Sequence, residues 1–177
     1  MQKKILGIDP GSRVTGYGII ESEGQSYNLV VCGVVRTDQE KNFSMRLKKI
    51  YESLSFVIHK YWPTEVACES LFFAKNVSSA LKLGQARGAA LTAVANEGLP
   101  LFEYSATQIK KAVGGYGHSS KEQVQKMVSL LLGVNLQKAS IPLDATDALS
   151  IAICHLHSHK LLALMPSRRS DDRASTR

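Results

Sequence analysis

The stretch KILGIDPGSRVTGYG (residues 4–18) decides how this chain folds. Its first part, residues 4–9, is a short apolar run that ends in the turn signal Pro10-Gly11-Ser12, which is typical of a buried strand. Residues 15–20 predict the next strand, and their glycines indicate that the backbone there approaches another segment closely. Asp9 ends the first strand, where a buried carboxylate is costly unless it is paired or bound to a cation. The fold therefore begins with two consecutive strands and an acidic residue at their edge.

The segments that follow add one more strand of this kind and then alternate helices with strands. The valine-rich residues 27–37 predict a third strand, and the short connections favour an antiparallel meander of the three. Apolar spacing then predicts helices over residues 47–61 and 77–96, each followed by a strand, over 65–69 and 99–104. With three more helices after that, the order is β β β α β α β α α α, which is typical of an α/β domain.

Two capping boxes and a proline mark the starts of the last three helices. Ser105 and Gln108 form the first box, in which a hydroxyl and a long polar side chain satisfy each other's free backbone N–H groups. Ser119 and Glu122 form the second box in the same way. Pro142 opens the last helix, because its missing N–H is no loss in the first turn.

Composition and charge limit the classes of protein that this chain can be. Its 177 residues are within the usual size of one domain, so we expect a single domain over residues 1–165 and a basic, disordered tail over 166–177. The net charge of +7 favours a polyanionic partner, nucleic acid before membrane. An odd number of cysteines, no leader pattern and no membrane-length apolar run predict a cytoplasmic protein without membrane contact.

Four carboxylates predict a metal centre. Glu69 ends a short buried strand as Asp9 ends the first, so both emerge at one sheet edge if the two strands are neighbours. Asp144 and Asp147 are three residues apart near the start of an apolar helix and therefore share a helix face. Alone, Asp9 is explained as a turn residue and the two helix aspartates as complements to the helix dipole, whereas Glu69 is harder to explain in this way. Together they favour Mg²⁺ or Mn²⁺, and two such ions about 3.5–4 Å apart can hydrolyse a phosphodiester.

The sequence does not predict a competing zinc site. The three cysteines are not at metal-binding spacing. His155, His157 and His159 alternate at every second position, so this series is not expected to share a helix face. We interpret these histidines as solvated residues near a helix end.

Four segments carry a family resemblance: GIDPGSRVTGYG (residues 7–18), FFAKN (72–76), SALKLGQARG (79–88) and DATDALSIAICH (144–155). They resemble the RuvC crossover-junction endodeoxyribonucleases of bacteria, over about residues 4–159. The resemblance implies a ribonuclease H-like α/β fold with a five-stranded mixed sheet flanked by helices. It also implies a homodimer that resolves four-way (Holliday) DNA junctions by symmetric, Mg²⁺-dependent nicks in two opposed strands. The implied partners in recombination and repair are a branch-migration motor and a junction-binding protein.

The resemblance also assigns roles to individual residues. Its catalytic and metal-binding carboxylates fall on Asp9, Glu69, Asp144 and Asp147, where we expect two Mg²⁺ ions per active site, with Mn²⁺ able to substitute. Its DNA-contacting residues fall on Phe72, Lys110 and Lys121. Lys75 joins this group because a loop aromatic beside basic residues can stack on unpaired bases, whether through Phe72 or Phe73.

The helix predicted over residues 77–96 has a further pattern. One stripe of it carries Val77, Leu81, Gly84, Gly88, Leu91 and Ala95. Small residues in this helix, such as Gly84 and Ala86, permit close helix packing. The contact lies either in the core or across a dimer interface.

Two other functions remain as alternatives. An ATPase of the actin or sugar-kinase type also opens with a strand and an Asp-x-Gly turn, but it needs two such lobes and the sequence has one such turn. A module that binds junctions without cutting them would not require the full carboxylate set.

Overall fold

The computed structural model describes residues 3–24, 26–70 and 76–164. Strands β1 (Lys3–Asp9), β2 (Val14–Glu23) and β3 (Ser26–Arg36) form an antiparallel meander. Strands β4 (Glu65–Glu69) and β5 (Leu101–Tyr104) extend the sheet in parallel from the other side of β1. The strand order β3-β2-β1-β4-β5 confirms the five-stranded mixed sheet that the family resemblance implies.

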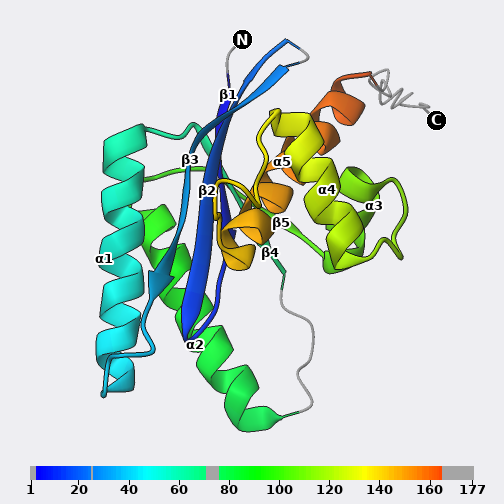
Figure 1. Cartoon of the computed structure of the whole chain (residues 1–177). Coiled ribbons are helices and arrows are strands. Elements are labelled where there is room, and N and C mark those ends of the chain that lie inside the picture. The colour runs from blue at the N-terminus through cyan, green and yellow to red at the C-terminus, as the bar shows by residue number, and fades with distance from the viewer. Residues whose placement is uncertain (1–2, 25, 71–75, 165–177) are drawn as a thin grey trace, which may run out of the picture.

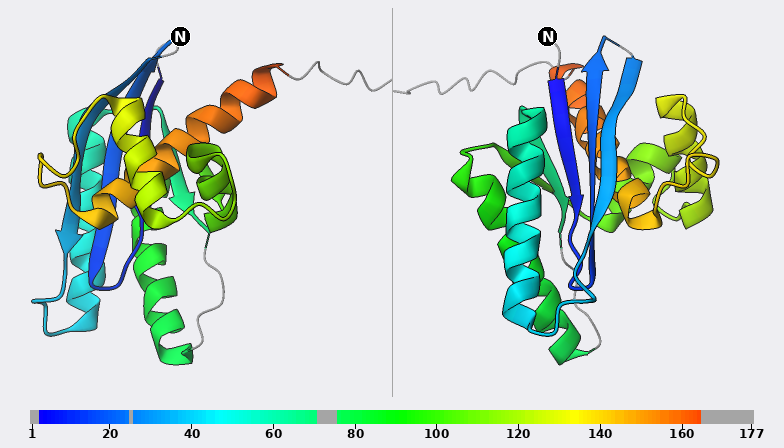
Figure 2. Two further views of the ribbon diagram at one scale, coloured as in Figure 1. Left: turned by 45° about the vertical axis from the view of Figure 1, so that its right-hand side comes forward. Right: turned by 60° about the vertical axis from the view of Figure 1, so that its left-hand side comes forward.

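Helices cover both faces of this sheet, as Figure 1 shows. One face carries α1 (Phe43–Tyr61) and α2 (Val77–Asn96). The other carries α5 (Leu143–Leu164), on which α3 (Ala106–Gly114) and α4 (Lys121–Leu132) pack. The two further views in Figure 2 show the same three layers. The predicted order of strands and helices is therefore confirmed along the described residues.

The alternation of side chains along β1 decides which residues face α5. Ile5 belongs to the core between the sheet and α5, whereas Leu6 and Ile8 belong to the core beneath α1 and α2. Because successive strand residues point to opposite faces, Asp9 lies on the α5 side with Ile5 and Gly7. At Gly7 a Cβ would collide with the backbone of α5, so this bare position lets the helix approach the sheet closely.

The second capping box lies one residue later than predicted. Ser120 accepts from the backbone N–H of Gln123, and the Gln123 side chain accepts from that of Ser120. Ser119 is buried and donates its hydroxyl to the carbonyl of Tyr116 at 2.7 Å, so it closes the loop before α4 instead of capping the helix. The first box, Ser105 with Gln108, is confirmed.

Helix α2 has its small residues on two faces with different surroundings. Its buried face is made of Ala86, Ala90, Ala93 and Val94. The predicted stripe is largely outside the core: Val77 and Leu81 are 74% and 64% exposed, and a Cβ on Gly84 would meet nothing within 4 Å. The buried alanines therefore pack against the core of this chain, whereas the stripe is largely exposed. Among the described residues, no helix combines the length and the hydropathy needed to cross a membrane.

Candidate active site

The ends of β1 and β4 bring two carboxylates to one edge of the sheet. The strands are parallel neighbours in which Ile8 pairs with Cys68, so Asp9 and Glu69 follow at the same level. Both lie on the face that α5 covers, because Ala67 of β4 belongs to the same core as Ile5. The condition that the two strands be neighbours, on which the shared edge depends, is therefore met.

The start of α5 brings the other two carboxylates to this edge. The backbone of Asp144 crosses directly over Gly16 of β2, where a Cβ would collide with the Asp144 carbonyl. Asp147 follows one turn later and accepts a hydrogen bond at 2.6 Å from the ammonium of Lys121, at the start of α4. The glycine spacing of the N-terminal motif thus determines how near α5 and its acids come to Asp9.

The four carboxylates interact electrostatically. The pKa of Asp9 is raised to about 7, first by burial and then by the charges of Asp147, Glu69 and Asp144. The pKa of Glu69 is also raised, by burial and by Asp147, while Lys110 and Lys121 act in the opposite direction. The acids therefore repel one another, with two lysines as partial compensation.

Two of the four carboxylates line a cavity of about 220 Å³. Glu69 and Asp147 lie in its wall together with Lys110 and Lys121, which places both predicted DNA-contacting lysines beside the acids. Phe72 and Lys75 lie outside the described residues. A set of oxygen donors alone suits a hard divalent cation. Burial and mutual repulsion disfavour the negative charges of these carboxylates, which raises their pKa values. A bound cation would neutralise those same charges.

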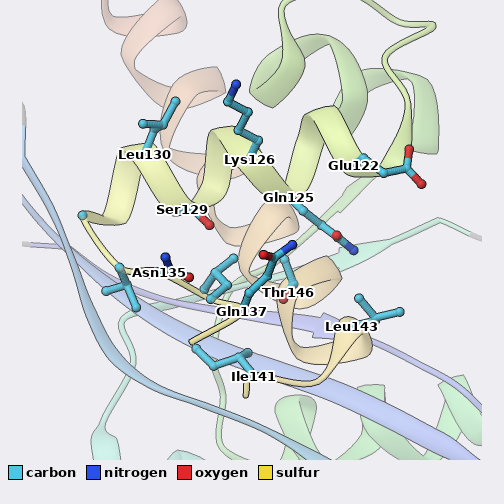
Figure 3. Close-up of a pocket in the computed structure, with 13 residues that line it drawn as sticks. Glu122, Gln125, Lys126, Ser129, Leu130, Asn135, Gln137, Ile141, Leu143 and Thr146 are labelled. Atoms are coloured by element: carbon cyan, nitrogen blue, oxygen red, sulfur yellow. The ribbon is translucent and has the colours of Figure 1, made fainter. Parts of the chain in front are cut away.

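A larger cavity, of about 680 Å³, lies between α4 and the segment that leads into α5. Figure 3 shows Gln125, Lys126 and Leu130 of α4 on one side of it and Ile141 on the other. None of the four predicted catalytic carboxylates lines this cavity, so its size does not make it the active site.

Two features of the site region escaped the sequence analysis. Arg87 of α2 donates to the backbone carbonyl of Glu69 at 3.4 Å and forms an ion pair with Glu103, which ties the end of β4 to its neighbours. A signal for Arg87 was present in the sequence, since it is the arginine beside small residues near the end of the SALKLGQARG motif.

The interpretation of the histidines as solvated was wrong for His155. Its side chain is fully buried, with Nδ1 2.7 Å from the Tyr104 hydroxyl and Nε2 2.6 Å from a carboxylate oxygen of Glu65. His155 and His159 are four residues apart and do share a helix face, with ring centroids 4.5 Å apart. The spacing of two positions between neighbouring histidines hides this relation, which exists only between the first and the third of the series.

Known structures of the same fold support the architecture. The structure "T. thermophilus RuvC in complex with Holliday junction substrate" matches with a TM-score of 0.84 at 34% identity, covering 90% of this chain and 96% of that one. The yeast mitochondrial Holliday junction resolvase matches with a TM-score of 0.68 at 15% identity, over 90% of this chain and 80% of its own, which shows a shared fold alone. The expected ribonuclease H-like fold is thereby confirmed.

Sequence relatives share nearly the whole chain. A family model described as crossover junction endodeoxyribonuclease RuvC matches residues 5–155. A protein of that name from Geobacter sulfurreducens is 52% identical, covering 94% of this chain and 99% of its own length. Another, from a Shewanella species, is 49% identical over 93% of this chain and 92% of its own. The chain therefore belongs to the RuvC family of crossover junction endodeoxyribonucleases.

Proposed function

We propose that this protein resolves four-way (Holliday) DNA junctions by symmetric, metal-dependent nicks in two opposed strands during recombination and repair. The observation that carries this proposal is the meeting of carboxylates from β1, β4 and α5 around one edge of the sheet. Family membership supports the choice of substrate, because a RuvC relative at 34% identity is bound to a Holliday junction substrate.

The four acids, Asp9, Glu69, Asp144 and Asp147, would hold the catalytic cations. We propose two Mg²⁺ ions per site, with Mn²⁺ able to substitute, since oxygen donors without histidine or cysteine suit these hard ions. When bound, such a pair activates water and stabilises the leaving oxygen in phosphodiester hydrolysis. No nucleophilic side chain is required for this chemistry.

Lysines beside the acids would hold the DNA backbone. Lys121 lies in the first turn of α4, where free backbone N–H groups also attract phosphate, and its ammonium neutralises Asp147. Lys110 faces the same cavity from α3 and offsets the charge of Glu69. We propose that these two lysines, with Phe72 and Lys75, contact the junction and bring a phosphate to the carboxylates.

Paired nicks require two active sites at a fixed separation, which a two-fold homodimer provides. The exposed stripe of α2, defined by Val77, Leu81, Gly84 and Gly88, is an apolar surface with room for close approach of a second helix. We propose that this stripe lies in the dimer interface. A branch-migration motor and a junction-binding protein in the cytoplasm are the proposed partners.

Cleavage of a synthetic four-way junction tests this function. Each arm is end-labelled, and the protein is added with Mg²⁺ or with EDTA, beside a linear duplex of the same sequence. We expect paired nicks at opposed positions in Mg²⁺ and neither nicks in EDTA nor cleavage of the duplex. Asp9→Asn should bind the junction without cutting it, and Asp38→Asn, at an exposed aspartate elsewhere, should cut normally.

Other outcomes would point to the alternatives. Tight junction binding by the unmodified protein without cleavage would indicate a binding-only module. Strong thermal stabilisation by ATP without junction binding would indicate an ATPase of the actin or sugar-kinase type. Equal cleavage by Asp9→Asn would refute the assignment of Asp9 as a metal ligand. It would not contradict the assignment of the four-way junction as the substrate.

A further inference from the structure

A second group of metal-binding side chains lies on β4 and α5, away from the catalytic acids. It consists of Glu65, His155 and His159, whose ligand atoms all lie within 4.8 Å of one another. Among the described residues, no other set of three His, Cys, Asp or Glu side chains meets this condition, the four catalytic carboxylates included. The proximity of these ligand atoms makes the cluster a candidate metal site.

The distance between the two sites follows from the geometry of β4 and α5. Glu65 and Glu69 lie at the two ends of β4 and on the same face, about 13 Å apart at roughly 3.3 Å per residue. Asp147 and His155 are eight residues apart on α5, about 12 Å at 1.5 Å per residue. The strand and the helix thus bring Glu69 to Asp147 at one end and Glu65 to His155 at the other. The histidine cluster is a separate site, not an extension of the catalytic one.

Both imidazoles are directed at one oxygen of Glu65. The Nε2 atom of His155 lies 2.6 Å from Glu65 Oε2, and the Nε2 atom of His159 lies 3.6 Å from the same oxygen. Histidines four residues apart on one helix face are a common pair of metal ligands, because they present their rings side by side. A carboxylate opposite such a pair completes three ligands for a borderline divalent ion.

The surroundings orient His155 for this role. Its Nδ1 atom lies 2.7 Å from the hydroxyl of Tyr104, which fixes the orientation of the ring so that Nε2 faces Glu65. The ring of Phe102 packs against both imidazoles, with centroids at 4.5 and 5.3 Å, and forms an apolar wall.

The site is reached from solvent on the His159 side. The side chain of His159 is 34% exposed, whereas that of His155 is fully buried. Lys3 lies at the mouth, where its ammonium is 2.6 Å from the other carboxylate oxygen of Glu65. Lys3 therefore pairs with Oε1 and not with Oε2, the oxygen that faces the two imidazoles, but its charge opposes a metal cation. A metal ion here competes with Lys3 electrostatically, not for the same oxygen.

We propose that Glu65, His155 and His159 bind a borderline divalent transition-metal ion, with Zn²⁺ as the best fit, and solvent as a further ligand. Such an ion would cross-link the start of β4 to the second half of α5, the helix that carries two catalytic acids at its other end. The site would be selective against Mg²⁺, which prefers oxygen donors and octahedral geometry. This inference does not depend on the nuclease function.

Metal binding to the full-length, metal-stripped protein tests the proposal. Excess Mg²⁺ is present throughout so that the catalytic carboxylates are occupied. We expect Zn²⁺ to bind one site per chain by calorimetry and to raise Tm by several degrees. We expect Co²⁺, as a coloured substitute, to give the visible absorption of a site with imidazole ligands.

Variants at the partly exposed edge of the cluster are expected to fold normally. His159→Ala removes a half-exposed ligand and should weaken Zn²⁺ binding at least about tenfold. His118→Ala removes an exposed histidine elsewhere and should bind as the unmodified protein does. Lys3→Met removes the opposing charge and should tighten binding. Mg²⁺-dependent junction cleavage is expected to be unchanged in all three.

Two results would overturn the proposal. If Zn²⁺ neither binds nor raises Tm in excess Mg²⁺, the cluster is only a hydrogen-bonded His–Glu group. If Zn²⁺ binds equally well to His159→Ala, the ion occupies another site. Loss of binding in Asp147→Asn with full binding in that His159 variant would place the ion at the catalytic carboxylates instead.

Discussion

At the scale of single residues, Asp9 has the strongest electrostatic signature of the candidate active site. Its pKa is raised from 3.8 to about 7 by burial and by three neighbouring carboxylates. The folded protein therefore holds this proton up to about pH 7, whereas the unfolded chain releases it near pH 3.8. Between those values folding takes up a proton, so the contribution of Asp9 to the free energy of unfolding falls as pH rises.

Replacing Asp9 with asparagine should remove this pH dependence. In EDTA, Asp9→Asn is expected to match the unmodified protein near pH 4 and to become more stable above pH 7, by on the order of 4 kcal/mol at most. Urea unfolding across this pH range measures the difference, with the exposed Asp38→Asn as the control. Mg²⁺ should stabilise the unmodified protein but not Asp9→Asn. A constant stability difference between pH 4 and 8 would show that Asp9 is not buried among charges.

Single residues also show where sequence reasoning about the site succeeds and fails. Asp9 and Glu69 were predictable because each ends a buried strand, and the period of two along a strand gives them a common face. His155 was not, because its burial depends on Glu65 and Tyr104, which come from two other elements. Local spacing identifies charges at element ends more readily than partners brought together by packing.

At the scale of elements, the position of α5 on the sheet depends on glycines in β1 and β2. Gly7 and Gly16 leave the sheet surface bare where the backbone of α5 crosses it at Ala148 and Asp144. This contact holds the first turns of α5, and therefore two of the four carboxylates, against the edge where Asp9 lies.

A methyl group at Gly16 should displace the active site. In Gly16→Ala the new Cβ would collide with the Asp144 carbonyl, which is backbone and cannot rotate away. We expect a loss of stability of about 1–3 kcal/mol and a drop in junction cleavage of roughly a hundredfold. Melting curves and single-turnover cleavage measure the two effects. Junction binding should persist, because Lys110 and Lys121 belong to other helices, and full cleavage by a folded variant would contradict this account.

The elements themselves were largely predictable from periodicity. Their order and the bounds of α2 were predicted correctly, since strong apolar patterns leave few alternatives. The start of α4 was displaced by one residue because two consecutive serines offered equivalent caps. Only the fold shows that the hydroxyl of Ser119 is used by the carbonyl of Tyr116. Apolar periodicity therefore predicts that a helix or strand is present. Where the element begins or ends depends on contacts with the adjoining loop.

At the scale of the whole molecule, the proposed activity requires a second copy of the chain. The sequence could not separate a core role from an interface role for the small residues of α2, because both favour small side chains. The fold separates them, with Ala86 and Ala90 in the core and Gly84 and Gly88 on the open stripe. Glycine in an exposed helix position costs about 1 kcal/mol relative to alanine, so its presence twice on this stripe favours an interface.

A charge on the α2 stripe should therefore separate the two protomers. Leu81 is 64% exposed, so Leu81→Glu is expected to fold normally and to shift the protein from dimer to monomer in analytical ultracentrifugation. Leu130→Glu on α4 is the matched control, since that leucine is also 64% exposed and lies on the opposite side of the sheet. In junction cleavage, Leu81→Glu should make the two opposed nicks independently of each other, because two separate monomers do not bind the junction as one unit. A Leu81→Glu protein that remains dimeric would place the interface elsewhere, and a monomer that still makes paired nicks would remove the need for a dimer.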